Sequence, residues 1–215
     1  MLERGCLTNR VCEAVEEGIL TGKYPAGHAL TEMELSQNCG VSRTPVRAAL
    51  QRLETEGLVR LVPNKGAVVL GISQQDLVDI YQMRMRLEGL AAAMAATRMT
   101  DEDKEKLEET VALAEFYVAR GDAARLRDLD SNFHQTVYLA SGSRMLQSTL
   151  TELHRKIGVW RAQSLSDPTR VKESTAEHRA ILDALKAGDS ALADELTSRH
   201  VERAMEHLLN VIQGE

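Results

Sequence analysis

The sequence predicts a mostly α-helical protein in two parts, with three short helices and a small β-hairpin ahead of an antiparallel all-α bundle of six or seven helices. Two observations predict this division. Residues 31–70 combine helix-capping residues, a short turn and two β-rich runs in close succession. The remainder consists of long helical segments separated by turn residues. The predicted domains are residues 1–70 and 74–215, with a hinge at residues 71–73.

Two helices joined by a four-residue turn are predicted in the first part. Thr31 and Glu34 form a capping box, in which each side chain satisfies one free backbone N–H at the start of a helix. Gly40 then ends that helix at little conformational cost. Ser42 can cap a second helix, and Pro45 fits its first turn because the missing N–H has no helical partner there. The pattern is that of a helix-turn-helix.

The second of these helices is predicted to have one buried and one basic face. Arg43, Arg47 and Gln51 recur at a spacing of four, so three long hydrogen-bond donors project from one exposed face. A helix that lies in the major groove of DNA requires such a face. The buried stripe of the same helix is predicted to consist of Val46, Ala49, Leu50 and Leu53.

A β-hairpin is predicted directly after this helix. The β-rich runs 58–62 and 67–70 flank Pro63 to Gly66, which have the composition of a hairpin turn. A hairpin in this place is a wing. A bare helix-turn-helix pattern leaves open a small helical domain with scattered arginines, but the complete ordered set favours a winged helix that binds DNA.

These motifs resemble those of a known protein family. The stretch GVSRTPVRAALQRLETEGLV, followed by PNKGAVV, resembles the winged-helix domain of the GntR superfamily of bacterial transcription regulators. The upstream stretch GILTGKYPAGHALTEMELS is similar to the first helix of that domain and its connection to the second. Met33 lies at a position that is basic in some members. The resemblance implies DNA contacts by Glu32, Ser42, Arg43, Thr44 and Arg47, and by Asn64, Lys65 and Gly66 from the wing.

Charge supports DNA binding only locally. The formal net charge of the whole chain is −6, which by itself argues against a nucleic-acid partner. Residues 1–70, however, hold 8 basic and 8 acidic side chains, while residues 71–215 hold 18 basic and 24 acidic ones. Residues 41–53 contain three arginines and no acidic residue, so a local basic surface remains where the contact is predicted.

The sequence also predicts a cytoplasmic protein. No apolar run approaches the length of a membrane span, and the first thirty residues lack a secretory hydrophobic segment. The three cysteines are an odd number without paired metal spacing, which favours free thiols in a reducing compartment over disulfides or a redox role. These cysteines are Cys6, Cys12 and Cys39.

The bundle that follows is predicted to bury an unusual set of polar side chains. Asp130 and His134 are one helical turn apart on the core side of their helix. His178 and His200 fall on the apolar stripes of two later helices. A single histidine of this kind is more often a hydrogen-bonded core residue, but three imidazoles converging on a buried carboxylate are unusual for packing alone. The remaining histidines, His28, His154 and His207, are predicted at the surface or at its boundary. The predicted helices cover residues 74–97, 101–119, 122–141, 143–164, 168–187 and 189–212.

The second part resembles the C-terminal ligand-binding domain, of the FCD type, in the FadR branch of the same family. The similar segments are DSNFHQTVYLASGS, EHRAILDALKAGD and HVERA. The branch often has S-G-N where this chain has S-G-S. The resemblance implies a divalent metal ion held by Asp130, His134, His178 and His200. Three imidazoles and a carboxylate suit Zn, Ni, Co, Fe or Mn, with one or two coordination positions left for a small carboxylic acid.

Arg84 is a candidate for binding that acid. It lies on the apolar stripe of the first bundle helix, where a guanidinium needs an anionic partner. The partner is either the carboxylate of the effector or Glu88 one turn away, and the sequence leaves both open.

The expected function is that of a ligand-responsive repressor and not of an enzyme. A homodimer is expected to bind a near-palindromic operator of a catabolic operon and to leave it when an organic acid binds at the metal. Two alternatives stay open, a metal sensor and, less favoured, a metalloenzyme with an added DNA-binding domain. The chain has no H-E-x-x-H run that would support the enzyme.

Overall fold

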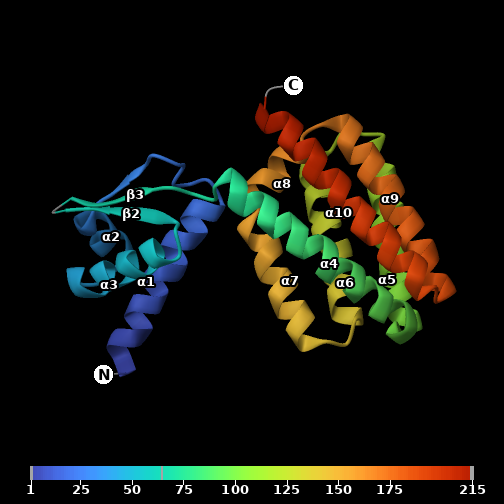
Figure 1. Ribbon diagram of the computed structural model, residues 1–215, viewed down its shortest axis with the longest axis horizontal. Helices are drawn as coiled ribbons and strands as arrows, with labels where there is room; N and C mark the ends of the chain where they lie inside the picture. Colours follow the sequence, from blue (N-terminus) through green and yellow to red (C-terminus); the bar gives the residue numbers. More distant parts are fainter. Residues whose placement is uncertain (1, 64, 214–215) are drawn as a thin grey trace. The chain divides into compact units, whose positions relative to one another are not determined.

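The computed structural model describes residues 2–63 and 65–213, with side chains described from Cys6 onward. Within these residues there are ten helices and three strands, so the predicted mostly α-helical class is confirmed (Figure 1). The chain divides into two compact units, residues 1–76 and 77–215. The division falls in the first turn of α4, just after the predicted hinge at residues 71–73.

The first unit has the predicted winged helix-turn-helix. Leu35 of the first helix of the motif packs with Val46 and Leu50 of the second in one apolar core. That core continues into the first helix and the sheet through Val11 and Val69. Its elements are α1 (Leu2–Leu20), β1 (Ala29–Leu30), α2 (Glu32–Cys39), α3 (Arg43–Thr55), β2 (Val59–Val62) and β3 (Gly66–Val69).

The turn between α2 and α3 follows from its capping residues. The Thr31 hydroxyl accepts a hydrogen bond from the Glu34 backbone N–H at 3.2 Å, which is the first half of the predicted capping box. Gly40 ends α2 with φ 65°, in the left-handed region that glycine adopts at low cost. Ser42 occupies the N-cap position of α3, but its side chain makes no capping hydrogen bond.

The sheet contains one strand more than the predicted hairpin. Its order is β1-β3-β2, and both pairs are antiparallel, with Leu30 opposite Ala67 and Leu61 opposite Ala67 on the other side. The wing was predicted, but β1 was not. A two-residue strand has no alternating pattern of its own, and it is defined only by hydrogen bonds to a segment far along the chain.

Gly66 is required at the wing by two features of the backbone. Its φ is 111°, and a Cβ there would overlap the backbone carbonyl of Leu30 in β1. We expect Gly66→Ala to lower the free energy of unfolding by more than about 1–3 kcal/mol, because the overlap adds to the backbone strain. Gly57→Ala is the matched control, since Gly57 has φ 75° but open space around its Cβ. Equal losses in chemical denaturation would show that the approach to Leu30 has no cost.

The second unit consists of seven helices in the part of the chain that is described, in agreement with the predicted six or seven. The segment predicted as one helix over residues 143–164 is interrupted at Ile157, a fully buried residue that leaves helical geometry just before Gly158. The helices are α4 (Gln74–Arg98), α5 (Asp101–Val118), α6 (Ala123–Ala140), α7 (Arg144–Lys156), α8 (Gly158–Ser164), α9 (Pro168–Ala187) and α10 (Ser190–Gln213).

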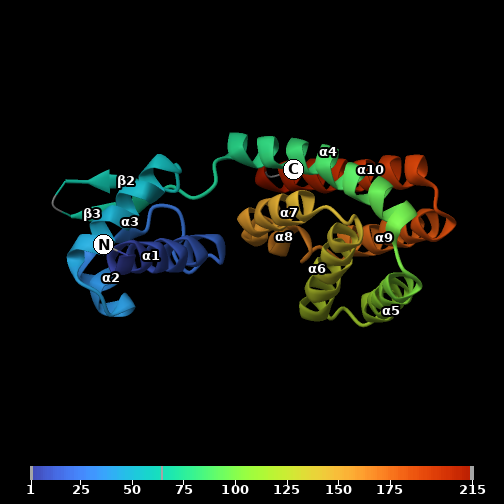
Figure 2. The same cartoon turned by 90° about the horizontal axis from the view of Figure 1, so that it is seen from below.

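The core of the second unit lies between α4, α5, α6, α9 and α10. Ala95, Val111, Phe133, Leu182 and Ala193 are fully or almost fully buried in a single cluster to which each of these helices contributes. Figure 2 shows α4 beside α10, and the Ser198 hydroxyl of α10 donates to the Met85 carbonyl of α4 at 3.0 Å. Among the described helices, none combines the length and the apolar character that crossing a membrane requires.

Candidate metal centre and DNA-binding surface

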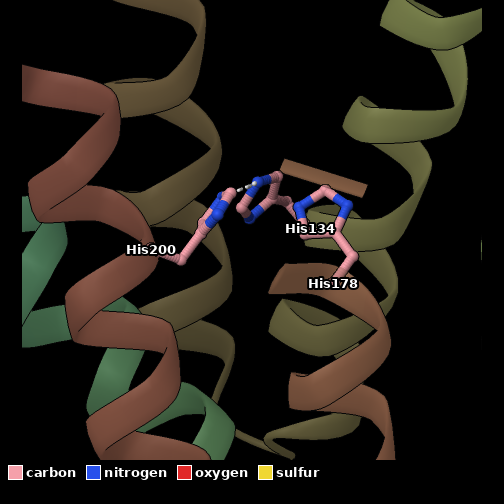
Figure 3. A group of neighbouring side chains, drawn as sticks. All are labelled: His134, His178 and His200. Atoms are coloured by element: carbon pink, nitrogen blue, oxygen red, sulfur yellow. Dashed lines mark hydrogen bonds between the residues drawn. The ribbon is translucent and has the colours of Figure 1, made fainter. Parts of the chain in front are cut away.

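Three histidines from three helices converge in the interior of the second unit. His134 comes from α6, His178 from α9 and His200 from α10, and none is more than 4 % exposed (Figure 3). One ring nitrogen of each lies within 4.8 Å of the corresponding atoms of the other two. The Nε2 atoms of His134 and His200 face each other at 3.4 Å. The helical stripes that predicted these residues therefore meet at one place.

Asp130 completes the predicted set of four. One of its carboxylate oxygens, Oδ1, lies 3.7 Å from His178 Nε2 and 4.0 Å from His134 Nε2. The other oxygen, Oδ2, accepts a hydrogen bond from the Arg161 guanidinium of α8. Burial alone would raise the pKa of Asp130, but Arg161 and the neighbouring imidazoles hold it well below its usual value. The carboxylate is therefore ionised beside the three rings.

Two further carboxylates contact the outer nitrogens of these rings, and the sequence analysis did not identify them as parts of the site. Glu177 Oε2 is hydrogen-bonded to His200 Nδ1 at 2.7 Å. Glu88 Oε2 lies 3.0 Å from His134 Nδ1, a close charge contact without the alignment of a full hydrogen bond. Glu177 directly precedes His178, and the sequence analysis considered Glu88 only as a partner for Arg84.

The donor set fits a divalent cation. Carboxylates can only accept hydrogen bonds, so those at Nδ1 favour the proton there and leave Nε2 as a lone pair. Two such lone pairs at 3.4 Å repel each other unless a cation lies between them. Burial lowers the pKa of His178 and His200. A proton is therefore disfavoured as the positive charge that these rings share. The His178 Nε2 atom is buried without a hydrogen-bond partner. A metal ion would satisfy all three nitrogens.

A small cavity of about 30 Å³ adjoins His134 and His200 and has room for one or two water molecules. Arg84, Arg161 and Arg170 line it, together with Asp130 and others. Its complete lining is Tyr81, Arg84, Asp130, His134, Arg161, Ser164, Leu165, Arg170, Ser174, His200 and Ala204. An anion is the ligand class that three guanidinium groups favour.

Of the two partners that the sequence left open for Arg84, the structure contains Glu88. The Arg84 Nε donates to Glu88 Oε1 at 2.6 Å, and both side chains are almost completely buried. The internal ion pair is therefore present, while the same guanidinium also lines the cavity. Burial by itself would lower the pKa of Arg84, but the charge of Glu88 raises it above its usual value.

His154 was predicted at the surface or its boundary, and that prediction is wrong. The side chain of His154 is only 5 % exposed, and its Nδ1 lies 3.2 Å from the Tyr138 hydroxyl. His154 lies just off the apolar stripe of α7, on the side that contacts α6. The stripe on α7 does not indicate this contact with a neighbouring helix. His28 and His207 are half-buried, as expected for boundary positions.

The predicted DNA contacts lie mainly on the exposed side of α3. Ser42, Arg43, Thr44 and Arg47 are exposed, and the Arg47 side chain retains 64 % of its accessible surface. The Arg47 Nε donates to Glu32 Oε1 of α2 at 2.7 Å, so two predicted contact residues are brought together. In the wing, Lys65 is exposed and Gly66 is buried against β1, while Asn64 lies outside the described residues.

The folds of the two units place the protein in the class of winged-helix proteins with an all-helical second domain. Residues 7–69 match the family "Bacterial regulatory proteins, gntR family", and residues 79–203 match the FCD domain. The chain belongs to the GntR family of bacterial regulators and carries an FCD domain, as the sequence resemblance implied. Its relatives are transcriptional regulators and not enzymes.

Individual relatives agree with this assignment. The "Probable D-xylose utilization operon transcriptional repressor" of Paenarthrobacter nicotinovorans is 30 % identical over 93 % of this chain and 88 % of the relative. The transcriptional repressor RspR of Escherichia coli is 25 % identical over 87 % of this chain and 82 % of that protein. Among solved structures, McbR/YncC of Escherichia coli has a TM-score of 0.73 at 23 % identity, covering 96 % of this chain and 98 % of its own.

A second solved structure resembles the helical unit alone. It is described as the metal-free FCD domain of a transcriptional regulator, and it has a TM-score of 0.55 at 16 % identity. The match covers 67 % of this chain and 99 % of the other. At this identity the likeness concerns the fold only.

Proposed function

We propose that this chain is a ligand-responsive, DNA-binding repressor of a catabolic operon, released from its operator by a small carboxylic acid bound at a divalent metal ion. The observation that carries the proposal is the convergence of three buried imidazoles and one ionised carboxylate beside a cavity lined by arginines. Such a donor set is costly to bury without a cation. The proposed site of action is the cytoplasm, where the operator is accessible.

The ligands of the proposed metal ion are Asp130 and the three histidines, and the ion is Zn, Ni, Co, Fe or Mn. When bound, the metal would supply a Lewis-acidic centre that attracts a carboxylate oxygen. Asp130 would bind the metal through Oδ1, because Oδ2 accepts a hydrogen bond from Arg161.

The proposed effector is a small organic acid. Arg161 and Arg170 line the cavity together with Arg84, and each guanidinium is paired with a carboxylate of the protein. Because bidentate arginine contacts favour carboxylates, we expect these groups to orient the acid against the metal. The cavity must widen when the acid binds, and this links the site to the packing of α8 and α9.

On the DNA side, we propose a homodimer whose two α3 helices lie in successive major grooves of a near-palindromic operator. Arg43 and Arg47 would contact base edges or phosphates from the exposed side of α3. Lys65 would reach the minor groove from the wing. Light scattering of the free protein and of its operator complex checks the two-to-one stoichiometry.

An effector of this kind should be found by thermal shift. We expect one member of a panel of hydroxy, keto and sugar acids to raise the melting temperature of the metal-loaded protein and to weaken operator binding. By linkage, operator DNA must lower the affinity for that acid by the same factor. An acid whose affinity is unchanged by saturating operator DNA would not be the inducer, however tightly it binds.

A metal sensor is the second candidate, because the same four ligands can report on the ion alone. Titration of metal into metal-free protein with labelled operator separates the two. The proposed repressor loses DNA affinity only when both metal and acid are present. Loss of operator binding on addition of metal alone would favour the sensor.

A further inference from the structure

A further inference, which rests on the proposed metal site, concerns the two carboxylates next to the Nδ1 atoms of His200 and His134. We propose that Glu177 and Glu88 are positioning residues, which fix the orientation and the tautomer of these imidazoles so that both Nε2 lone pairs face the metal. The observation behind this proposal is that each ring has a carboxylate near its Nδ1 atom and turns its Nε2 atom toward the other ring. Glu177 lies 2.7 Å from His200 Nδ1 and Glu88 lies 3.0 Å from His134 Nδ1, while the two Nε2 atoms face each other at 3.4 Å.

Glu177 cannot itself serve as a ligand, because its carboxylate is saturated with donors. Its Oε2 accepts from His200 Nδ1 and from Arg170 Nη2 at 2.9 Å. Its Oε1 accepts from Arg170 Nη1 at 3.3 Å and from Arg203 Nη1 at 3.1 Å. A carboxylate offers about four lone-pair sites, and all four are used. Glu177 therefore acts on the metal only through His200.

The arginines also keep Glu177 ionised. Arg170 donates two hydrogen bonds to this carboxylate, and Arg203 donates one. An ionised acceptor at Nδ1 holds the proton there more firmly than a neutral group. Glu88 has the same kind of support, since Arg84 donates to its second oxygen at 2.6 Å. Each of these two histidines thus has a carboxylate that is fixed in turn by an arginine.

The orientation of His178 is set by a ring contact and not by a carboxylate, so His178 serves as an internal control. Its ring stacks on Phe133 with a centroid distance of 4.0 Å and an interplanar angle of 13°. Stacking fixes the plane of the ring but not its tautomer. The structure describes no hydrogen bond from His178 to Glu177 or Glu88, so the tautomer of His178 should depend much less on them than that of His200.

The first test needs no metal. Long-range ¹H–¹⁵N NMR of the histidine rings in the full-length, metal-free protein reports which nitrogen carries the proton. We expect the Nδ1–H form at His200 in the wild type and a mixture of tautomers in Glu177→Ala. His200 with its proton on Nε2 in the wild type would overturn the proposal. The His178 signals should be the same in both proteins, and a matching change there would point to general disruption and count against a local role.

The second test measures metal affinity with a competing chelator. Loss of an outer-shell partner typically lowers metal affinity by about 10- to 100-fold, and we expect Glu177→Ala to fall in this range. Glu177→Gln keeps an acceptor oxygen for the Nδ1–H and should recover part of the loss, even if the alanine variant folds poorly. The control is Glu173→Ala, one turn earlier on α9, whose side chain is 61 % exposed and 3.8 Å from Arg170.

The two tests separate failure of the positioning role from failure of the metal site. Wild-type affinity in both Glu177 variants would overturn the positioning role while leaving the proposed function intact. A wild-type protein that binds none of the five metals would overturn the proposed function, and with it the metal-directed role of Glu177. The NMR result would then still report whether the carboxylate sets the tautomer of His200.

Discussion

His200→Ala is expected to lower the affinity for the divalent metal by more than about 100-fold, because outer-shell changes alone cost about 10- to 100-fold and this change removes a ligand. The variant also takes away the partner of Glu177, but that carboxylate keeps its contacts with Arg170 and Arg203. The fold of the unit should therefore persist. Affinity is measured by chelator competition, with the metal content of the purified protein as a second readout.

His207→Ala is the matched control for this experiment. It makes the same change on the same helix, two turns later, where His207 is half-buried and outside the three-histidine group. Its metal affinity should equal that of the wild type. If His200→Ala and His207→Ala bind metal equally well, the four-ligand assignment is wrong.

Arg47→Ala is expected to weaken operator binding by roughly 5- to 150-fold if the guanidinium contacts a base edge. In the free protein this side chain is mostly exposed and paired with Glu32 across the turn between α2 and α3. Glu32 is therefore a partner that Arg47 must release or keep when DNA binds. The measurement is a binding titration at fixed salt with an operator selected from a random duplex library.

The control for Arg47 is Arg52→Ala on the same helix. Arg52 is similarly exposed but is turned toward Glu56 and Asn9, away from the predicted contact face. We expect little change in operator affinity for Arg52→Ala. Equal losses for both variants would indicate a general charge effect and would remove Arg47 from the set of base contacts.

The parts of the fold that the sequence predicts well are those defined by local interactions. The N-cap at Thr31 and the left-handed Gly40 act within one turn of the backbone they satisfy, so their signals lie in consecutive residues. β1 could not be predicted in this way, because its two residues are strand only through pairing with Val68 and Ala67. The break at Ile157 was missed because the apolar stripe continues across it.

The same difference between local and long-range contacts explains which parts of the candidate site the sequence predicted. Helical periodicity places Asp130 and the histidines on inward faces, and the structure brings them together. Glu177 and Arg161 were missed because they act between helices. Glu177 reaches from α9 to His200 on α10, and Arg161 reaches from α8 to Asp130 on α6. A stripe on one helix contains no information about which neighbouring helix a flanking charge will meet.

The most direct test of the central claim is a crystal structure of the metal-loaded protein, with anomalous scattering recorded at the absorption edge of the bound ion. The account predicts one strong anomalous peak per chain in the second unit. His134, His178 and His200 should contact it through nitrogen, and Asp130 through oxygen, at about 2.0–2.2 Å. A fully loaded crystal with its peak elsewhere, or with none of these four side chains in contact, would contradict the claim.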